Sequence, residues 1–348
     1  MFSILKPFIF KIDPEMAHDL AIKSLKYNFL PEEIFRVENE SILETKIFDT
    51  KIKNPIGLAA GFDKSAEVYN SLFKFGFGFI EVGTITPKEQ YGNPKPRVFR
   101  LEGDRALINR LGFNNDGLEK VSKRLKKNSP TNFLGINIGP NRDSKNKIED
   151  YLKCIKEIYN FANYITINIS SPNTPGLRDF HDKNTLKQLL KNITEFTKKN
   201  KIQKPLVLKI SPDIASNEVG NIIELVKEFN VSGVIISNTT DKNRENLTGK
   251  FKNEFGGLSG EPLAEISNNL IKKFYSEVKG EILIIGVGGV NSGLTAYEKI
   301  KSGASLLQLY TGMVYEGPGI VKKIKSELID ILEKEKIKNV SEIVGAGS

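Results

Sequence analysis

Short apolar runs alternate with longer amphipathic stretches over most of the chain. Between the runs, apolar residues recur at helical spacing in segments such as 221–229 and 293–303. This alternation predicts a parallel α/β sheet. Eight such units favour a closed (β/α)8 TIM barrel with an interior of Ile, Leu and Val, and an open doubly wound sheet is the alternative. The eight runs are 54–61, 78–84, 133–139, 164–170, 206–210, 233–240, 282–289 and 306–312.

Residues 1–40 do not follow this rhythm. Residues 2–10 are mostly apolar, and a second helical pattern follows, with Asp13 as N-cap and Pro14 as first helical residue. We predict an extension of two amphipathic helices at 1–40, before a catalytic barrel domain at 41–340. The apolar run is too short to span a bilayer. The extension is either a cap packed on the barrel or a membrane-surface patch, for which these side chains look exposed: Phe2, Ile4, Leu5, Phe8 and Ile9.

Composition narrows the possible partners. The net charge is +9, but the basic runs 120–128 and 198–204 fall at helix ends without interleaved aromatic residues. We therefore expect no nucleic-acid partner, whereas an anionic ligand or an anionic membrane surface suits the charge.

The only cysteine, Cys154, excludes an internal disulfide, a four-cysteine zinc site and an iron–sulfur cluster within the chain. It lies in a helical pattern, where we expect simple packing, and we expect no metal.

The predicted strands end in polar residues or glycine. In a TIM barrel, the carboxyl ends of the strands form the active-site mouth, so these residues predict a ligand site. The seventh and eighth strands lead into small-residue loops, 286–293 and 310–319, which suit a phosphate, although plain turns are the alternative.

The other strand ends fit a flavin and a second ligand. Lys209 can stabilise negative charge near N1 of a reduced flavin. Four asparagines offer the donors and acceptors that a pyrimidine ring needs: Asn109, Asn168, Asn173 and Asn238.

The segment "INISSPNTPGL" (167–177) places Ser171 where a buried strand becomes a loop. A nucleophilic serine usually needs a histidine base, but the chain has only His18 and His181. The pattern alone leaves the role of Ser171 open.

Long ordered motifs resemble dihydroorotate dehydrogenases. They include "LAAGFDK" (58–64), "EVGTITPKEQYGNPKPRVFRL" (81–101), "INRLGFNN" (108–115), "GINIGPN" (135–141) and "INISSPNTPGLR" (167–178). The motifs "ISNTT" (236–240), "GGLSG" (256–260) and "IGVGG" (285–289) complete the set. The chain is similar to the class 2, quinone-dependent enzymes, because it carries the N-terminal "DPEMAH" helix and has Ser171 where class 1 has cysteine.

The resemblance implies oxidation of (S)-dihydroorotate to orotate in pyrimidine (UMP) biosynthesis, with one non-covalent FMN and electrons passed to a membrane quinone. Ser171 would be the base that removes the C5 proton while C6 delivers hydride to flavin N5. A monomer, peripheral on the cytoplasmic side of the cell membrane, is implied. The matching FMN contacts are Ala60, Gly61, Lys64, Thr84, Asn137, Asn168, Lys209, Ser237, Gly260, Gly289, Tyr310 and Thr311.

The resemblance also assigns the remaining site residues. The quinone tunnel would be lined by His18 and Arg100. Contacts to dihydroorotate or orotate match Lys64, Asn109, Arg110, Leu111, Gly112, Phe113, Asn168, Asn173, Asn238 and Thr239.

Three competing functions make distinct predictions. A class 1 enzyme, which uses fumarate or a nicotinamide acceptor, would lack the helical extension and would have a cysteine base. A flavin barrel that reduces uridine in transfer RNA would need a catalytic cysteine, whereas Cys154 lies on a predicted helix away from the mouth. A non-enzymatic RNA-binding module would hold no flavin.

Overall fold

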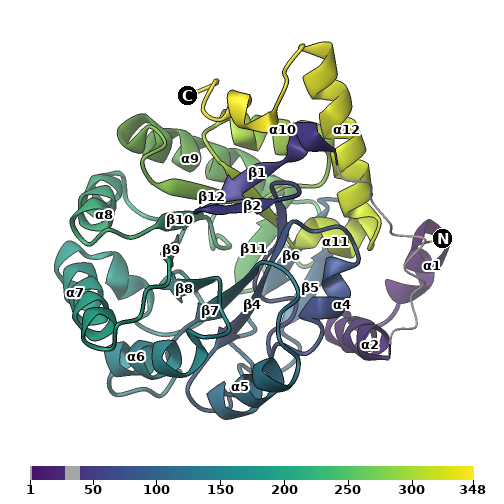
Figure 1. Cartoon of the computed structure of the whole chain (residues 1–348). Coiled ribbons are helices and arrows are strands. Elements are labelled where there is room, and N and C mark those ends of the chain that lie inside the picture. The colour runs from purple at the N-terminus through teal and green to yellow at the C-terminus, as the bar shows by residue number, and fades with distance from the viewer. Residues whose placement is uncertain (1, 28–39) are drawn as a thin grey trace.

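The barrel is built from eight of the strands in the computed structural model, which describes residues 2–27 and 40–348. These are β3 (Ile56–Leu58), β4 (Phe79–Ile85), β7 (Leu134–Ile138), β8 (Tyr164–Asn168), β9 (Leu206–Ile210), β10 (Gly233–Ile236), β12 (Leu283–Val287) and β13 (Leu306–Leu309). They close in the order β10–β12–β13–β3–β4–β7–β8–β9, all paired in parallel (Figure 1). Each strand falls in a predicted run, with β4 ending one residue later, so the predicted TIM barrel is confirmed.

Helices surround the barrel, as Figure 1 shows. They are α4 (Tyr69–Phe73), α5 (Leu118–Lys127), α6 (Lys147–Ile158), α7 (Lys183–Lys199), α8 (Ser216–Glu228), α9 (Ala264–Val278), α10 (Gly293–Lys301), α11 (Thr311–Glu316) and α12 (Ile320–Lys334). Short 3-10 helices occupy Ser41–Leu43, Arg178–His181, Glu261–Leu263 and Val340–Ile343.

Helix α7 illustrates how the sequence specifies these elements. Asp182 caps it, because its carboxylate accepts the backbone N–H groups of Asn184 and Thr185 at 3.0 Å. Its apolar residues recur at helical spacing and are buried against the barrel: Leu186, Leu189, Leu190 and Ile193. On α6, Cys154 is fully buried, which confirms that it packs in the core.

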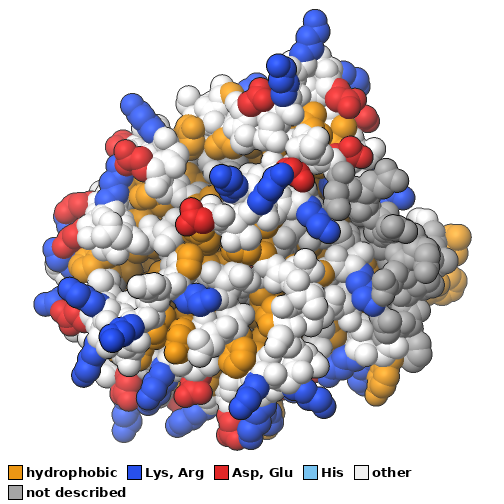
Figure 2. Space-filling view, viewed as in Figure 1, with side chains coloured by type: hydrophobic (Ala, Val, Ile, Leu, Met, Phe, Trp, Pro, Cys, Tyr) orange, Lys and Arg blue, Asp and Glu red, His pale blue; other side chains and the backbone are white. Residues whose placement is uncertain are grey.

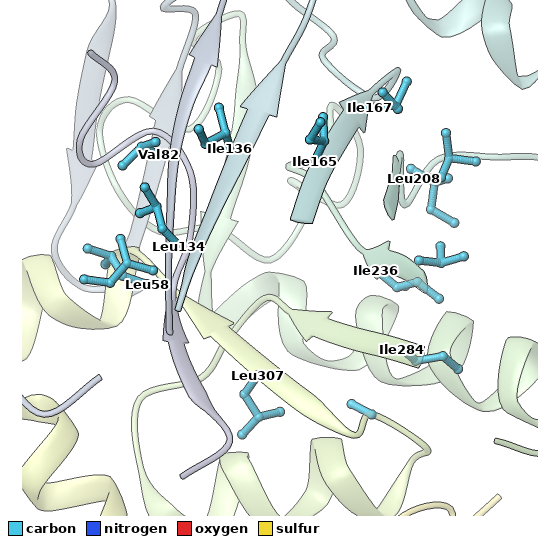
Figure 3. Packing of buried hydrophobic residues seen from close by; sticks show 14 of the residues in the cluster. Leu58, Val82, Leu134, Ile136, Ile165, Ile167, Leu208, Ile236, Ile284 and Leu307 are labelled. Carbon is cyan, nitrogen blue, oxygen red and sulfur yellow. The ribbon is translucent and has the colours of Figure 1, made fainter. Parts of the chain in front are cut away.

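The core has an outer and an inner part. The outer part lies between strands and helices. Figure 3 labels some of its side chains, all on barrel strands: Leu58, Val82, Leu134, Ile136, Ile165, Ile167, Leu208, Ile236, Ile284 and Leu307. The inner part fills the amino end of the barrel around Phe79 and Tyr164. Gly57 and Gly135 make room for these rings, because a Cβ there would lie 2.4 Å from the Phe79 ring and 2.1 Å from the Tyr164 ring.

An unpredicted hairpin joins this inner cluster. Its strands β1 (Thr45–Ile47) and β2 (Thr50–Ile52) pair antiparallel. Ile47 and Ile52 pack with Phe79 and Tyr164, which are the first residues of their own strands. The hairpin therefore closes the end of the barrel opposite to the predicted mouth.

The interior above this cluster is polar, so the prediction of an interior made only of Ile, Leu and Val is wrong. The inward positions of β4, β8, β9 and β13 carry the buried residues Glu81, Thr166, Lys209 and Gln308. Glu81, Thr166 and Gln308 are tolerated because Glu81 accepts hydrogen bonds from the other two, which offsets the loss of water, whereas Lys209 donates to no other described residue. A second unpredicted feature is an antiparallel sheet in the order β11–β6–β5, from β5 (Val98–Leu101), β6 (Ala106–Asn109) and β11 (Gly257–Gly260).

Two helices precede the barrel, as predicted. They are α1 (Phe2–Ile9) and α2 (Pro14–Lys26), and Asp13 caps α2 by accepting the N–H groups of Glu15 and Met16. They lie together at one edge of the molecule, where Figure 2 shows hydrophobic side chains on the surface. Ile4 is 72% exposed and Phe8 is 66% exposed. The predicted boundary between residues 40 and 41 stays a prediction, and residues 28–39 of the extension lie outside the described residues.

Within residues 2–27 and 40–348, every helix is too short or too polar to cross a bilayer.

Candidate active site

A cavity lies at the carboxyl ends of the barrel strands, and residues of β6 and β11 form its outer wall. Most of the residues that the sequence indicated meet there, although they lie in or just after seven of the barrel strands, all except β7, and in or just after β6 and β11. The cavity is lined by Ala60, Gly61, Lys64, Thr84, Asn109, Leu111, Gly112, Phe113, Asn168, Ser171, Asn173, Lys209, Ser237, Asn238, Thr239, Gly260, Gly289, Tyr310 and Thr311.

Four predicted residues do not line this cavity. Asn137 is fully buried and bonds to Thr84, which does line it. Arg110 extends away to form an ion pair with Glu254 at 2.7 Å. His18 lies on α2, and Arg100 bonds to the segment between α1 and α2; both are described below.

Lys209 is the buried cation of the site. It lies one residue before the end of β9, and its ammonium donates no hydrogen bond to another described residue. Burial lowers the pKa of Lys209, and the negative charge of Glu81 opposes this shift. A buried ammonium without a partner is costly, so this group calls for an anionic or acceptor group in the cavity.

Lys64 connects the cavity to the N-terminal helices. Its ammonium lies 3.1 Å from Nε2 of His18 on α2. Burial lowers the pKa of Lys64 to about 8, and burial together with the Lys64 charge lowers the pKa of His18 to about 3. His18 is therefore neutral at pH 7, and its Nε2 accepts a hydrogen bond from Lys64. The imidazole also packs edge-on against Phe62, with ring centroids 5.0 Å apart.

Arg100 holds the segment between α1 and α2. Its guanidinium donates to the carbonyl of Ile12 at 2.8 Å and to that of Phe10 at 3.3 Å. It also stacks over the Phe10 ring, 4.7 Å from the centroid. Arg100 and His18 thus both lie where the extension meets the barrel domain.

Ser171 is buried, lines the cavity, and has no histidine partner among the described residues. Its hydroxyl accepts the backbone N–H of Asn173 at 3.2 Å. His181 is engaged elsewhere, since Nδ1 lies 2.9 Å from the Arg178 carbonyl and Nε2 accepts the N–H of Ser211 at 3.2 Å. Both histidines are therefore engaged with groups other than Ser171, and a histidine-activated nucleophile does not fit this loop.

Asn173 presents a free polar atom to the cavity. Asn173 donates its amide N–H to the Asn109 carbonyl at 3.2 Å, which leaves its Oδ1 buried without a partner. Such an atom is expected to accept a hydrogen bond from a bound ligand.

Glycines shape the far end of the cavity, beside β11 and β12. Gly260, Gly288 and Gly289 have φ values of +100°, +119° and +74°. A Cβ on Gly289 would lie 2.4 Å from the Cβ of Ala264, and one on Gly260 would lie 2.4 Å from the Arg105 carbonyl oxygen. Only glycine fits these positions, and the backbone left bare there suits a phosphate group.

Comparison with known proteins agrees with this geometry. The family described as "Dihydroorotate dehydrogenase" matches residues 42–332. A "Dihydroorotate dehydrogenase (quinone)" of Bartonella tribocorum is 47% identical over 96% of this chain and 93% of its own length. The mitochondrial "Dihydroorotate dehydrogenase (quinone)" of Mus musculus is 42% identical over 96% of this chain and 87% of its own.

The chain belongs to the dihydroorotate dehydrogenase family. Its relatives place it in the quinone-dependent class 2. Among solved structures, the crystal structure of "DHODH in complex with ferulenol from Eimeria tenella" superposes with a TM-score of 0.92 at 38% identity, covering 96% of this chain and 95% of that one.

Sequence reasoning missed one part of this dihydroorotate dehydrogenase site. Glu81, Tyr164, Thr166 and Gln308 form a buried polar cluster inside the barrel. The only available signal was a lone carboxylate in the otherwise apolar run "GFIEVGT". The described residues contain no group of three or more His, Cys, Asp or Glu side chains placed to hold a metal ion.

Proposed function

We propose that the chain oxidises (S)-dihydroorotate to orotate with one non-covalent FMN and passes the electrons to a membrane quinone, as part of pyrimidine biosynthesis. Family membership supports the substrate and the acceptor. The observation that carries the proposal is the meeting of Lys209, without a hydrogen-bond partner among the described residues, and Ser171 in one cavity.

The cavity fits FMN at both ends. Gly260 and Gly289 leave backbone bare where the phosphate would bind, beside Thr311. Lys209 would hold the negative charge of the isoalloxazine near N1, and Thr84, Asn168 and Ser237 would bond to the ring. FMN, when bound, supplies the acceptor for hydride from the substrate.

Ser171 would act as the base at C5 of dihydroorotate. The N–H of Asn173 donates to its hydroxyl, which places the oxygen toward the cavity. Asn109, Asn173 and Asn238 would hold the pyrimidine ring in position, and Lys64 would bind its carboxylate side. A hydrogen-bonded path from Ser171 to solvent, rather than a histidine, would carry the proton away.

Electrons would leave toward the N-terminal helices. His18 and Arg100 would line the quinone path, supported by the direct contact between His18 and Lys64. The exposed apolar side chains of α1 would hold the protein, a monomer, on the cytoplasmic side of an anionic membrane.

A direct test is steady-state oxidation of dihydroorotate by the purified chain with a long-tailed quinone, fumarate or NAD as alternative acceptors. We expect turnover with the quinone only, and a flavin absorbance spectrum in the purified protein. Turnover with fumarate or NAD in place of quinone would reject the proposed acceptor, and a colourless protein would reject the flavin.

A further inference from the structure

The loop that carries Ser171 is closed by an arginine at its end. We call residues 169–177, between β8 and Arg178, the Ser171 loop. Nε of Arg178 donates to the carbonyl of Ser170 at 3.3 Å, at the start of this loop. Nη2 of the same guanidinium donates to the carbonyl of Thr239 at 3.3 Å, in the segment after β10. A single side chain therefore ties the start of the loop to its end and to a neighbouring segment of the barrel mouth.

Two carboxylates hold the guanidinium in place. Asp213 lies 3.0 Å from Nη2, and Asp241 lies 3.1 Å from Nη1. Asp213 is itself fixed, because it accepts the Thr240 hydroxyl and, at 3.2 Å, the backbone N–H of Asp241. Bonds between a guanidinium and a carboxylate are among the stronger hydrogen bonds in proteins. Arg178 thus joins the segments that follow three neighbouring strands, β8, β9 and β10.

His181 fixes the backbone of the same arginine. Its Nε2 accepts the N–H of Ser211 at 3.2 Å, so the proton of the neutral ring is on Nδ1. Nδ1 then donates to the carbonyl of Arg178 at 2.9 Å. Burial lowers the pKa of His181 from 6.5, which keeps the ring neutral at pH 7. The side chain and the main chain of Arg178 are therefore both anchored outside the Ser171 loop.

The carbonyl of Ser170 sets the direction in which the chain enters Ser171, because it shares one rigid peptide plane with the N–H of Ser171. The N–H and the hydroxyl of Ser170 bond to Oδ1 of Asn168, but these bonds lie before the rotation that orients the plane. Among the described residues, the carbonyl accepts a hydrogen bond only from Arg178. The next peptide bond leads into Pro172, which has no N–H to donate. The orientation of this plane therefore depends on Arg178.

The other anchor of the loop lies beyond Ser171. Nδ2 of Asn173 donates to the carbonyl of Asn109 at 3.2 Å, and the N–H of Asn173 donates to the Ser171 hydroxyl at 3.2 Å. These bonds fix how the chain leaves the serine, whereas the bond from Arg178 fixes how the chain enters it.

We propose that Arg178 is a positioning residue, which places the Ser171 hydroxyl for proton removal by holding the peptide plane that leads into Ser171. Arg178 does not line the cavity, so it acts through the serine. This inference rests on the proposed function, since an effect of Arg178 on the rate requires Ser171 to be the base.

The bond to Thr239 gives Arg178 a second route to the reaction, which the experiment must separate from the first. Thr239 lines the cavity, and its N–H donates to Oδ1 of Asn238 at 2.9 Å. That bond does not involve Arg178, so Thr239 keeps an anchor when the arginine is replaced. An effect through Thr239 would weaken ligand binding, whereas an effect through Ser171 would slow the reaction of bound substrate.

The test measures flavin reduction in Arg178→Ala by rapid mixing at saturating dihydroorotate, and orotate affinity from the change in flavin absorbance. We expect the rate of reduction to fall by about tenfold or more, because a small misplacement of a reacting group has an effect of this scale. Orotate affinity should fall by a smaller factor than the rate.

The decisive comparison repeats the substitution in Ser171→Ala. There we expect Arg178→Ala to lower the residual rate by no more than about twofold, because the hydroxyl that Arg178 positions is already absent. An arginine needed only for folding or for ligand binding would lower the rate by the same factor with and without the serine.

Lys183→Met is the matched control. Lys183 pairs with Glu224 at 2.6 Å and so also links the segment after β8 to the segment after β9, but it lies outside the Ser171 loop. We expect Lys183→Met to reduce its flavin at the rate of the unchanged protein.

The contrary outcomes are equally definite. A normal rate in Arg178→Ala, an equal loss in Lys183→Met, a loss confined to orotate affinity, or an undiminished effect in Ser171→Ala would each reject the positioning role. If Arg178→Ala loses its flavin, Arg178→Lys takes its place, because its charge still faces both carboxylates while the Nε bond to Ser170 is gone. If that variant also loses its flavin, Arg178 serves stability only and the proposal is rejected. Failure of the proposed function would show separately, as an unchanged protein without flavin or a normal rate in Ser171→Ala.

Discussion

At the scale of single residues, this site shows how burial and hydrogen bonding assign roles to ordinary side chains. Ser171 has a backbone N–H as its partner instead of a histidine. The neutral His18 accepts from Lys64, and His181 is held by two backbone groups. The base role proposed for Ser171 would then depend on its position in the loop and on the electron acceptor proposed for the cavity.

Replacing Ser171 should therefore impair the reaction more than the binding. We expect Ser171→Ala to keep its flavin and to bind orotate, whereas flavin reduction by dihydroorotate falls by about 10² or more, the usual scale for a general base. Ser171→Cys should regain part of the rate as pH rises toward about 8.5, where a thiol ionises. Rapid-mixing absorbance measures both rates, and a near-normal rate in the alanine variant would remove Ser171 from the mechanism.

The burial of Lys299 on α10 leads to a prediction about stability. The side chain is 1% exposed, and its ammonium donates to Ser267 at 3.1 Å and to Asn268 at 2.5 Å. Burial lowers its pKa from 10.5 to about 7. Between about pH 7 and 10.5 the unfolded chain holds a proton that the folded chain has lost, so stability rises with pH.

We compare the free energy of unfolding of the unchanged protein with that of Lys299→Met. We expect the value for the unchanged protein, minus the value for the variant, to rise by about 2 kcal/mol between pH 7 and 9. Urea unfolding at several pH values measures it. The exposed Lys272→Met serves as control and should follow the unchanged protein at every pH. A constant difference between Lys299→Met and the unchanged protein across this range would contradict the prediction.

At the scale of elements, α1 and α2 are amphipathic helices attached to the side of the barrel domain. Arg100 and Lys64 hold them through the Ile12 carbonyl and His18. Their outer face keeps large apolar side chains in water, which is unfavourable for a protein without a partner surface. Docking to the barrel therefore leaves a different face of the same helices for the membrane contact that we propose.

Removing residues 1–40 should separate the two half-reactions. We expect the truncated protein to keep its flavin and its reduction by dihydroorotate, whereas turnover with a long-tailed quinone drops sharply because the apolar entry is lost. Quinone turnover as fast as that of the full chain would mean that the helices are only a structural cap.

A milder variant tests the membrane face alone. Ile4→Ser with Phe8→Ser should reduce sedimentation with anionic vesicles while leaving flavin reduction unchanged, because both side chains are largely exposed. Phe255→Ser, at a residue 69% exposed outside the N-terminal helices, is the matched control and should bind vesicles normally. Equal vesicle binding by all three proteins would contradict a role of α1 at the membrane.

At the scale of the whole molecule, a closed barrel carries a cavity at its strand ends, and we propose that this cavity holds a single flavin. We expect one FMN per chain, released on denaturation, in a protein that sedimentation or light scattering reports as a monomer. Release of FAD, or half an equivalent of FMN, would contradict the predicted stoichiometry, and a stable dimer would contradict the predicted oligomeric state.

The sequence by itself determined the barrel and most of the site. Apolar runs separated by helical patterns specify strands and helices directly, because each element must bury one face. The topology then brings strand ends together whatever their distance along the chain, so Lys64, Ser171 and Lys209 could be grouped from strand ends alone.

Only the tertiary structure decided how polar groups are paired. In the local sequence, Glu81 is an isolated carboxylate in an apolar strand. Its partners Tyr164, Thr166 and Gln308 follow it by 83 to 227 residues. The antiparallel sheet β5–β6–β11 likewise joins segments about 150 residues apart, such as Ile108 with Leu258. Hydrogen-bond direction and long-range strand pairing carry no local period, so they appear only when the chain is folded.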